Sequence, residues 1–164
     1  MIAFTDADAV LQRPFTSEEI AFMDEIQPGD VLIGRNAPDP NQTLLDESTK
    51  IMPKVSQAVI NFRFPGIDWM RCANCGFVVA TLGTWKRIYA EFCKIWRAVD
   101  VSFDNPAKVQ FGVCFVVQNS KEFNLRELPL TIHAHGHLSL PPGVHFTDGK
   151  WMCGEHVIAF AHAL

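Results

Sequence analysis

Two short motifs place metal-binding residue types at the same spacing in distant parts of the chain. Cys72 and Cys75 are separated by two residues, and so are Cys153 and His156. Two intervening residues let both side chains of a pair reach one zinc ion, with each sulfur about 2.3 Å from the metal. A Trp-Met dipeptide precedes each motif. The spacing therefore predicts one closed, structural zinc site formed by these four residues, which would clamp two distant segments together and contribute to folding.

Glu155 adds a catalytic alternative to this zinc site. The segment from Cys153 to Glu155 resembles the ligand-x-Glu element of zinc deaminases, and Cys72 and Cys75 resemble their paired-cysteine element, in the reverse chain order. In that chemistry a zinc-bound water attacks the nucleobase of the substrate, and the glutamate transfers the proton. The resemblance implies a zinc-dependent deaminase with Glu155 as the proton shuttle.

The residues before the second motif indicate a fold for a zinc domain. Segment 142–147, Pro-Gly-Val-His-Phe-Thr, resembles the Pro-Gly-x-x-aromatic-Thr of the cereblon-type domains, which belong with the Yippee proteins to the β-tent group. This partial resemblance implies two zinc knuckles on separate hairpins that hold two sheets together. His156 stands where those families have a cysteine, and no aromatic cage is evident here, so a ligand pocket is not carried over.

Cys153 is also a candidate nucleophile. Residues 27–33 and 151–157 are similar to the first strand and the nucleophile segment of circularly permuted papain-like hydrolases, the lineage of the NlpC/P60 and lecithin-retinol acyltransferase families. The resemblance implies a thiol that is activated by a helix N-terminus and by a histidine base.

The base of such a hydrolase has more than one candidate. Residues 56–60, where the permuted families carry their histidine, contain none, so the base would come from His133, His135 or His137. In an unpermuted arrangement Cys75 would be the nucleophile and His137 the base. Both arrangements stay open at the level of the sequence.

Three histidines alternate with apolar residues in segment 130–140. On a strand, His133, His135 and His137 share one face at intervals of about 6.5 to 7 Å, and His145 would lie across a hairpin from them. Such a face could bind a second metal, act as acid and base, or respond to pH. The alternative is a solvated polar face. In either case the core is expected to receive Leu130, Ile132, Ala134 and Leu138.

The elements that position these residues follow from local patterns. Thr16 and Glu19 have the spacing of a capping box, and apolar periodicity predicts helices at residues 17–26, 44–52 and 84–97. Alternation or short apolar runs predict strands at residues 31–33, 57–64, 109–118, 130–140 and 144–151. Segments 77–82 and 153–164 fit either type. The pattern predicts a zinc-clamped α+β domain over residues 1–164, with a largely antiparallel sheet, one long amphipathic helix and short helices.

The composition limits the function classes. The chain has 164 residues, is 48% hydrophobic and carries a net charge of −4, which argues against general nucleic-acid binding. It lacks a basic, apolar leader and any apolar run of membrane length, so we expect a soluble, intracellular protein that does not enter a membrane. We therefore expect a zinc-stabilised, non-catalytic binding or structural domain with a protein partner, as a component of a larger assembly. The alternatives are the cysteine hydrolase and the zinc deaminase.

Overall fold

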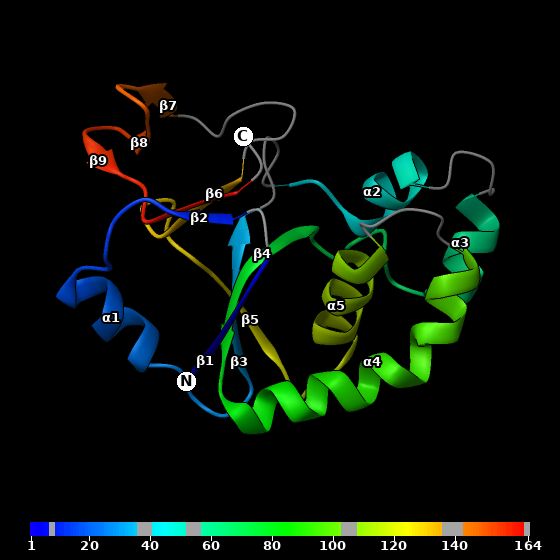
Figure 1. Cartoon of the computed structure of the whole chain (residues 1–164). Coiled ribbons are helices and arrows are strands. Elements are labelled where there is room, and N and C mark those ends of the chain that lie inside the picture. Colours follow the sequence, from blue (N-terminus) through cyan, green and yellow to red (C-terminus); the bar gives the residue numbers. More distant parts are fainter. Residues whose placement is uncertain (7–8, 36–40, 52–56, 103–107, 136–142, 163–164) are drawn as a thin grey trace.

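Helices and strands are mixed along the chain and surround a four-stranded main sheet, which confirms the α+β class (Figure 1). The computed structural model describes residues 1–6, 9–35, 41–51, 57–102, 108–135 and 143–162. The strands of the main sheet are, in spatial order, β1 (Ile2–Thr5), β4 (Ala73–Ala80), β3 (Asp30–Arg35) and β5 (Asn124–Glu127). β4 is antiparallel to both of its neighbours, whereas β3 and β5 are parallel.

One face of the main sheet is covered by two helices. Helix α5 (Lys108–Asn119) lies against the sheet, and helix α4 (Leu82–Ser102) packs along α5 at the lower edge of Figure 1. The largest core cluster fills this layer and contains Val31, Ile33 and Phe111. It is completed by residues of two short helices, α2 (Leu44–Ile51) and α3 (Gln57–Arg63).

The opposite face of the main sheet packs against helix α1 (Ser17–Asp24). Leu32 of β3 points to this side and contacts a second cluster that includes Met23 of α1 and Phe77 of β4. Because side chains alternate along a strand, consecutive apolar residues of β3 serve the two clusters in turn. The continuous apolar run of this strand therefore reflects burial on both faces.

Two small sheets complete the fold. One has the order β2 (Ala9–Leu11), β10 (Phe160–His162) and β6 (His133–His135), and the other has the order β7 (Val144–Thr147), β8 (Lys150–Cys153) and β9 (His156–Val157). β10 is antiparallel to β2 and parallel to β6. The first small sheet thus joins an early segment of the chain to a late one.

Several local predictions are confirmed. α1 begins after Thr16, whose hydroxyl accepts a hydrogen bond from the Glu19 N–H while the Glu19 carboxylate accepts one from the Thr16 N–H, as a capping box requires. The strand at 31–33 lies within β3, α2 covers the predicted helix up to Ile51, and α4 contains residues 84–97. No helix in the described ranges has the length and apolar character needed to cross a membrane.

Two predicted strands are wrong because both segments are helices. Residues 109–118 lie in α5, where almost every side is buried, and a fully buried helix has the same apolar run as a buried strand. Residues 57–64 belong mainly to α3. There Ile60 and Phe64, four residues apart, are buried, whereas Phe62 is 89% exposed. Helical spacing, and not alternation, decides which of these side chains enter the core.

The prediction of one returning strand over residues 144–151 is also wrong, because the chain turns within this segment. β6 pairs with β10, and the segment expected to return along it forms its own hairpin, β7 with β8. The turn between β7 and β8 contains Asp148 and Gly149, both with positive φ (49° and 75°). An Asp-Gly pair favours this type of turn, and the sequence carried that signal. Residues 136–142 lie outside the described ranges.

Candidate functional site

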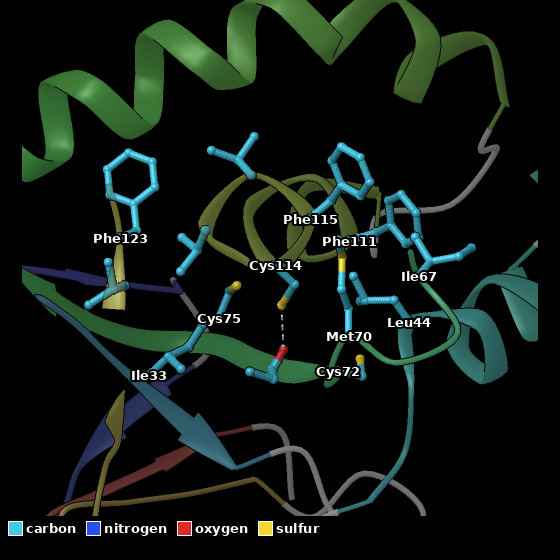
Figure 2. Close-up of a cluster of buried hydrophobic side chains, with 14 of the residues drawn as sticks. Ile33, Leu44, Ile67, Met70, Cys72, Cys75, Phe111, Cys114, Phe115 and Phe123 are labelled. Carbon is cyan, nitrogen blue, oxygen red and sulfur yellow. Dashed lines mark hydrogen bonds between the residues drawn. The ribbon is translucent and has the colours of Figure 1, made fainter. Parts of the chain in front are cut away.

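A bulge in β4 brings both cysteines of the first motif to the α5 side of the sheet. The register with β3 is regular as far as Val78 and resumes at Asn74, so residues 75–77 form a bulge. The extra residues shift the alternation of side chains. Cys72 and Cys75 consequently both belong to the core cluster beneath α5 (Figure 2).

Side chains of α5 at every fourth position hydrogen-bond to the backbone of the chain that enters β4. Gln118 Oε1 accepts from the Arg71 N–H at 2.8 Å, and Gln118 Nε2 donates to the Arg71 carbonyl at 2.7 Å. The Cys114 thiol donates to the Ala73 carbonyl at 3.3 Å. Four helical residues rise about 6 Å and two strand residues about 6.6 Å, so the two repeats nearly match. α5 therefore supplies this segment with the hydrogen bonds that a neighbouring strand would supply.

Gln110, Cys114 and Gln118 form one row along α5, which we call the stripe. Gln110 lies between the two cysteines of the first motif. Its Oε1 accepts from the Cys75 N–H at 3.2 Å, and its Nε2 lies 3.8 Å from the Cys72 sulfur. The Cys75 sulfur lies 4.0 Å from the Gln110 carbonyl oxygen. Cys72 is 4% exposed and Cys75 is 7% exposed. These contacts are those of small buried side chains that anchor a helix to a strand.

The second motif lies on a different part of the molecule. Cys153 ends β8 and pairs directly with His156, which begins β9, so these two side chains are cross-strand neighbours. Cys153 is half-buried against a small cluster around Val144 and Ile158, whereas His156 is exposed. The spacing thus predicted the proximity of these two residues within the motif.

The two motifs are not brought together. Within the described ranges, no three or more His, Cys, Asp or Glu side chains are grouped so that they could hold a metal ion. Cys72 and Cys75 pack under α5, and Cys153 packs with the third core cluster. The structure therefore gives no support to a zinc clamp made of these residues and His156.

The candidate catalytic residues of the hydrolase and the deaminase lie in surroundings that differ from one residue to the next. Cys153 is followed by the β8–β9 turn and not by the helix N-terminus that the hydrolase resemblance implies. Glu155 is exposed in that turn, and Cys75 is buried. His137, the proposed base for Cys75, lies outside the described residues.

The first histidine of segment 130–140 does not lie on a solvated face. His133 in β6 is completely buried, and its ring stacks on Phe77 at a centroid distance of 6.1 Å. A Cβ atom at Gly34 would lie 2.2 Å from His133 Nδ1, so this imidazole fits only because position 34 is glycine. His145 is exposed on β7, away from any pairing with β6. The backbone of His135 lies in β6, and His137 falls outside the described ranges.

Arg13 joins its own segment to two distant ones through backbone hydrogen bonds, and sequence patterns did not reveal these contacts. Its guanidinium contacts both carboxylate oxygens of Glu19 at 2.7 Å. It also donates to the carbonyls of Val157 at 2.6 Å, Thr131 at 3.2 Å and Pro14 at 2.8 Å. The hydrogen bond with Glu19 is the main cause that raises the pKa of Arg13, and the bond from Arg13 lowers the pKa of Glu19.

Asp30 is the charged side chain at the start of the central strand β3. Burial by itself would raise the pKa of its carboxyl group. Hydrogen bonds from the Gln27 N–H at 3.1 Å, Asn124 at 3.0 Å and Arg126 at 3.1 Å outweigh burial and hold the pKa below its usual value. This carboxylate therefore ties β3 to β5 in its ionised form.

The outer side of α4 is exposed and has two parts. Tyr89 is 70% exposed and Leu82 53% exposed, so the helix presents apolar surface to solvent near its start. A hydrogen bond with Cys93, one turn further along, is the first cause that raises the pKa of Tyr89. Next to these residues lie four exposed basic side chains, Lys86, Arg87, Lys94 and Arg97.

The edge strand β1 extends this apolar surface. All four of its residues are exposed, among them Ile2 and Phe4. Trp85 of α4 links the strand to the helix, because its indole N–H donates to the Ile2 carbonyl at 3.1 Å and its ring lies 6.1 Å from that of Phe4. We call the combined region the β1–α4 surface; it consists of Ile2, Phe4, Leu82, Trp85, Lys86, Arg87, Tyr89, Lys94 and Arg97.

The apolar periodicity of segment 84–97 predicted the helix but did not identify this surface. One signal in the sequence could have identified the surface. The charged residues outside the apolar face of α4 are mostly basic. β1 itself was not predicted. Comparison with known proteins finds no family model, no curated protein and no solved structure that matches this chain.

Proposed function

We propose that this protein is a non-catalytic binding domain that binds another protein through the β1–α4 surface. The observation that carries the proposal is the exposure of Tyr89, at 70%, beside Leu82 and next to exposed arginines. Tyrosine and arginine are among the residues that contribute most to binding energy at protein interfaces. Adjoining apolar side chains on a surface are typical of interaction sites.

The position of β1 supports the same proposal. In the order of the described strands, β1 ends the main sheet on its side. Natural sheet edges are usually protected by charged residues, proline or bulges, because an open edge pairs with other strands. None of the four residues of β1 is charged or proline. This edge therefore has the character of a strand that accepts a partner segment.

The zinc site, the hydrolase and the deaminase remain predictions from the sequence. The binding proposal does not depend on them. It uses residues that are accessible, whereas Cys72 and Cys75 are buried beneath α5.

Site-specific photo-crosslinking tests the proposal. A photoreactive phenylalanine analogue is placed at Tyr89 and, as a matched control, at Phe146, another exposed aromatic residue on β7. In extract from the source cells, we expect one discrete adduct at position 89, no such adduct at 146, and loss of the adduct when Phe4→Asp is added. Equal labelling at both positions, or no adduct at position 89, would overturn the proposal.

A further inference from the structure

The exposed side of α4 differs in charge from the rest of the chain. Residues 82–97 carry a net charge of +3, which leaves −7 for the remainder of a chain whose total is −4. Between residues 82 and 97, the one acidic residue is Glu91, and its side chain pairs with Lys94 at 2.5 Å. An exposed pair of this kind contributes little to stability. The outer side of α4 is therefore a basic area on an acidic molecule.

The basic side chains are arranged along the helix and partly held in place. Lys86 and Arg97 are eleven positions apart, which returns to nearly the same side of the helix after about 16 Å. The Arg87 guanidinium lies 5.9 Å from the centroid of the Phe123 ring, a cation–π contact that limits its freedom. Leu82 and Tyr89 border this row, so a partner meets positive charge and apolar surface together.

We infer that the partner presents an acidic segment of a protein, with carboxylates along Lys86, Arg87 and Arg97 and an apolar or aromatic side chain near Tyr89. This inference rests on the proposed function and specifies the chemistry of the partner. Carboxylates pair with guanidinium groups through two parallel hydrogen bonds, and tyrosine adds apolar contact area.

The charge of the remaining molecule selects this class of partner over larger polyanions. A nucleic acid or an anionic membrane extends beyond one helix face and meets the rest of the molecule, whose net negative charge repels it. A short acidic segment contacts the basic row alone. Its binding is expected to weaken with salt, because exposed charges are screened within about 10 Å at 0.1 M ionic strength.

Direct binding to defined probes is the first part of the test. A labelled copolymer of glutamate and tyrosine is titrated with the protein, alongside duplex DNA and vesicles that contain phosphatidylserine. We expect binding of the copolymer that falls about tenfold with Arg97→Glu and much less with Lys150→Glu, an equal charge change at an exposed site on β8. No binding of the copolymer, equal effects of the two variants, or tighter binding of DNA or vesicles would overturn the inference.

Crosslinking separates this inference from the proposal on which it rests. With the photoreactive group at position 89, Arg97→Glu is expected to reduce the adduct about tenfold, and the crosslinked partner peptide is expected to be acidic. An adduct that persists in Arg97→Glu, or that maps to a neutral or basic peptide, would overturn the acidic-partner inference and leave the binding function intact. Absence of any adduct would overturn the binding function as well.

Discussion

Helices α5 and α4 lie side by side, yet they use their polar residues in opposite ways. On α5 the stripe faces inward, and Gln118 and Cys114 give their hydrogen-bonding groups to the backbone of the chain entering β4. On α4 the exposed basic side chains point outward, near Tyr89. Polar residues with partners inside a protein fix its structure, whereas polar and aromatic residues at its surface are available to another molecule. The comparison assigns stability to α5 and binding to the outer side of α4.

Truncation of one aromatic residue on each helix should give the largest contrast in stability. Phe111 of α5 is completely buried, so Phe111→Ala is expected to lower the free energy of unfolding by about 3 to 5 kcal/mol through loss of packing and formation of a cavity. Tyr89→Ala on α4 should change it by less than about 0.5 kcal/mol. Urea unfolding measures both values. Similar losses in the two variants would break the comparison.

The next largest difference is expected between the thiol-labelling rates of exposed and buried cysteines under native conditions. Cys93 on α4 is exposed and Cys153 is half-buried, whereas the three cysteines of the β4–α5 contact are buried. Cys93 is expected to react at least about a hundredfold faster than the buried thiols, equivalent to about 2.8 kcal/mol of protection. Mass spectrometry after timed alkylation gives the order.

A chelator included in the same labelling experiment tests the zinc prediction. If chelation left every labelling rate unchanged, the buried thiols would owe their protection to packing. If chelation exposed Cys72, Cys75 and Cys153 together, the result would support the predicted zinc site. The interpretation of the β4–α5 contact would then be wrong.

Removal of one hydrogen-bonding side chain from the inward stripe should have an intermediate effect. Gln118→Leu takes away both partners of the Arg71 backbone, and we expect a loss of about 2 kcal/mol in the free energy of unfolding. Arg97→Gln, on the outward side of α4, should stay within about 0.5 kcal/mol. Denaturant titration of the two variants decides whether the stripe stabilises the fold; equal stability would show that it does not.

Acid should produce the smallest effect, through Asp30. Its pKa is lower in the folded protein than in the unfolded chain, so its stabilising effect is complete above the unfolded pKa of about 3.9 and is lost as the pH falls from there through the folded pKa. Melting temperatures measured between about pH 2.5 and 6 should fall more steeply for the wild type than for Asp30→Asn. Parallel curves would show that Asp30 contributes no pH dependence.

Local signals predicted the elements whose determinants lie close together in the sequence. The capping box of α1 and the apolar face of α4 depend on residues three or four positions apart, and both helices were predicted. Segment 109–118 was assigned wrongly because burial on nearly all sides removes the polar face that distinguishes a helix from a strand. Only the packing of α5 between the sheet and α4 resolves that ambiguity.

The candidate site was predictable only in fragments. The spacing correctly placed Cys153 beside His156, because both lie in one hairpin. It could not show that Cys72 and Cys75 pack under α5, since the bulge and the partner Gln110 depend on contacts more than 30 residues apart, such as that of Cys75 with Gln110 (|i−j| = 35). The β1–α4 surface likewise required the edge position of β1, which no local pattern indicates.

The contacts of Arg13 have a consequence for the order of events during synthesis. Its carbonyl partner Val157 lies 144 positions later in the chain. β2 also depends on a distant segment, because it pairs with β10. Its residues Val10 and Leu11 are exposed. The earlier segment must therefore wait for one that is synthesised 144 positions later, and until then its apolar strand has no sheet to join. Such long-range closure slows folding and leaves a nascent chain open to association, so a chain stalled before residue 157 would be a natural client for chaperones.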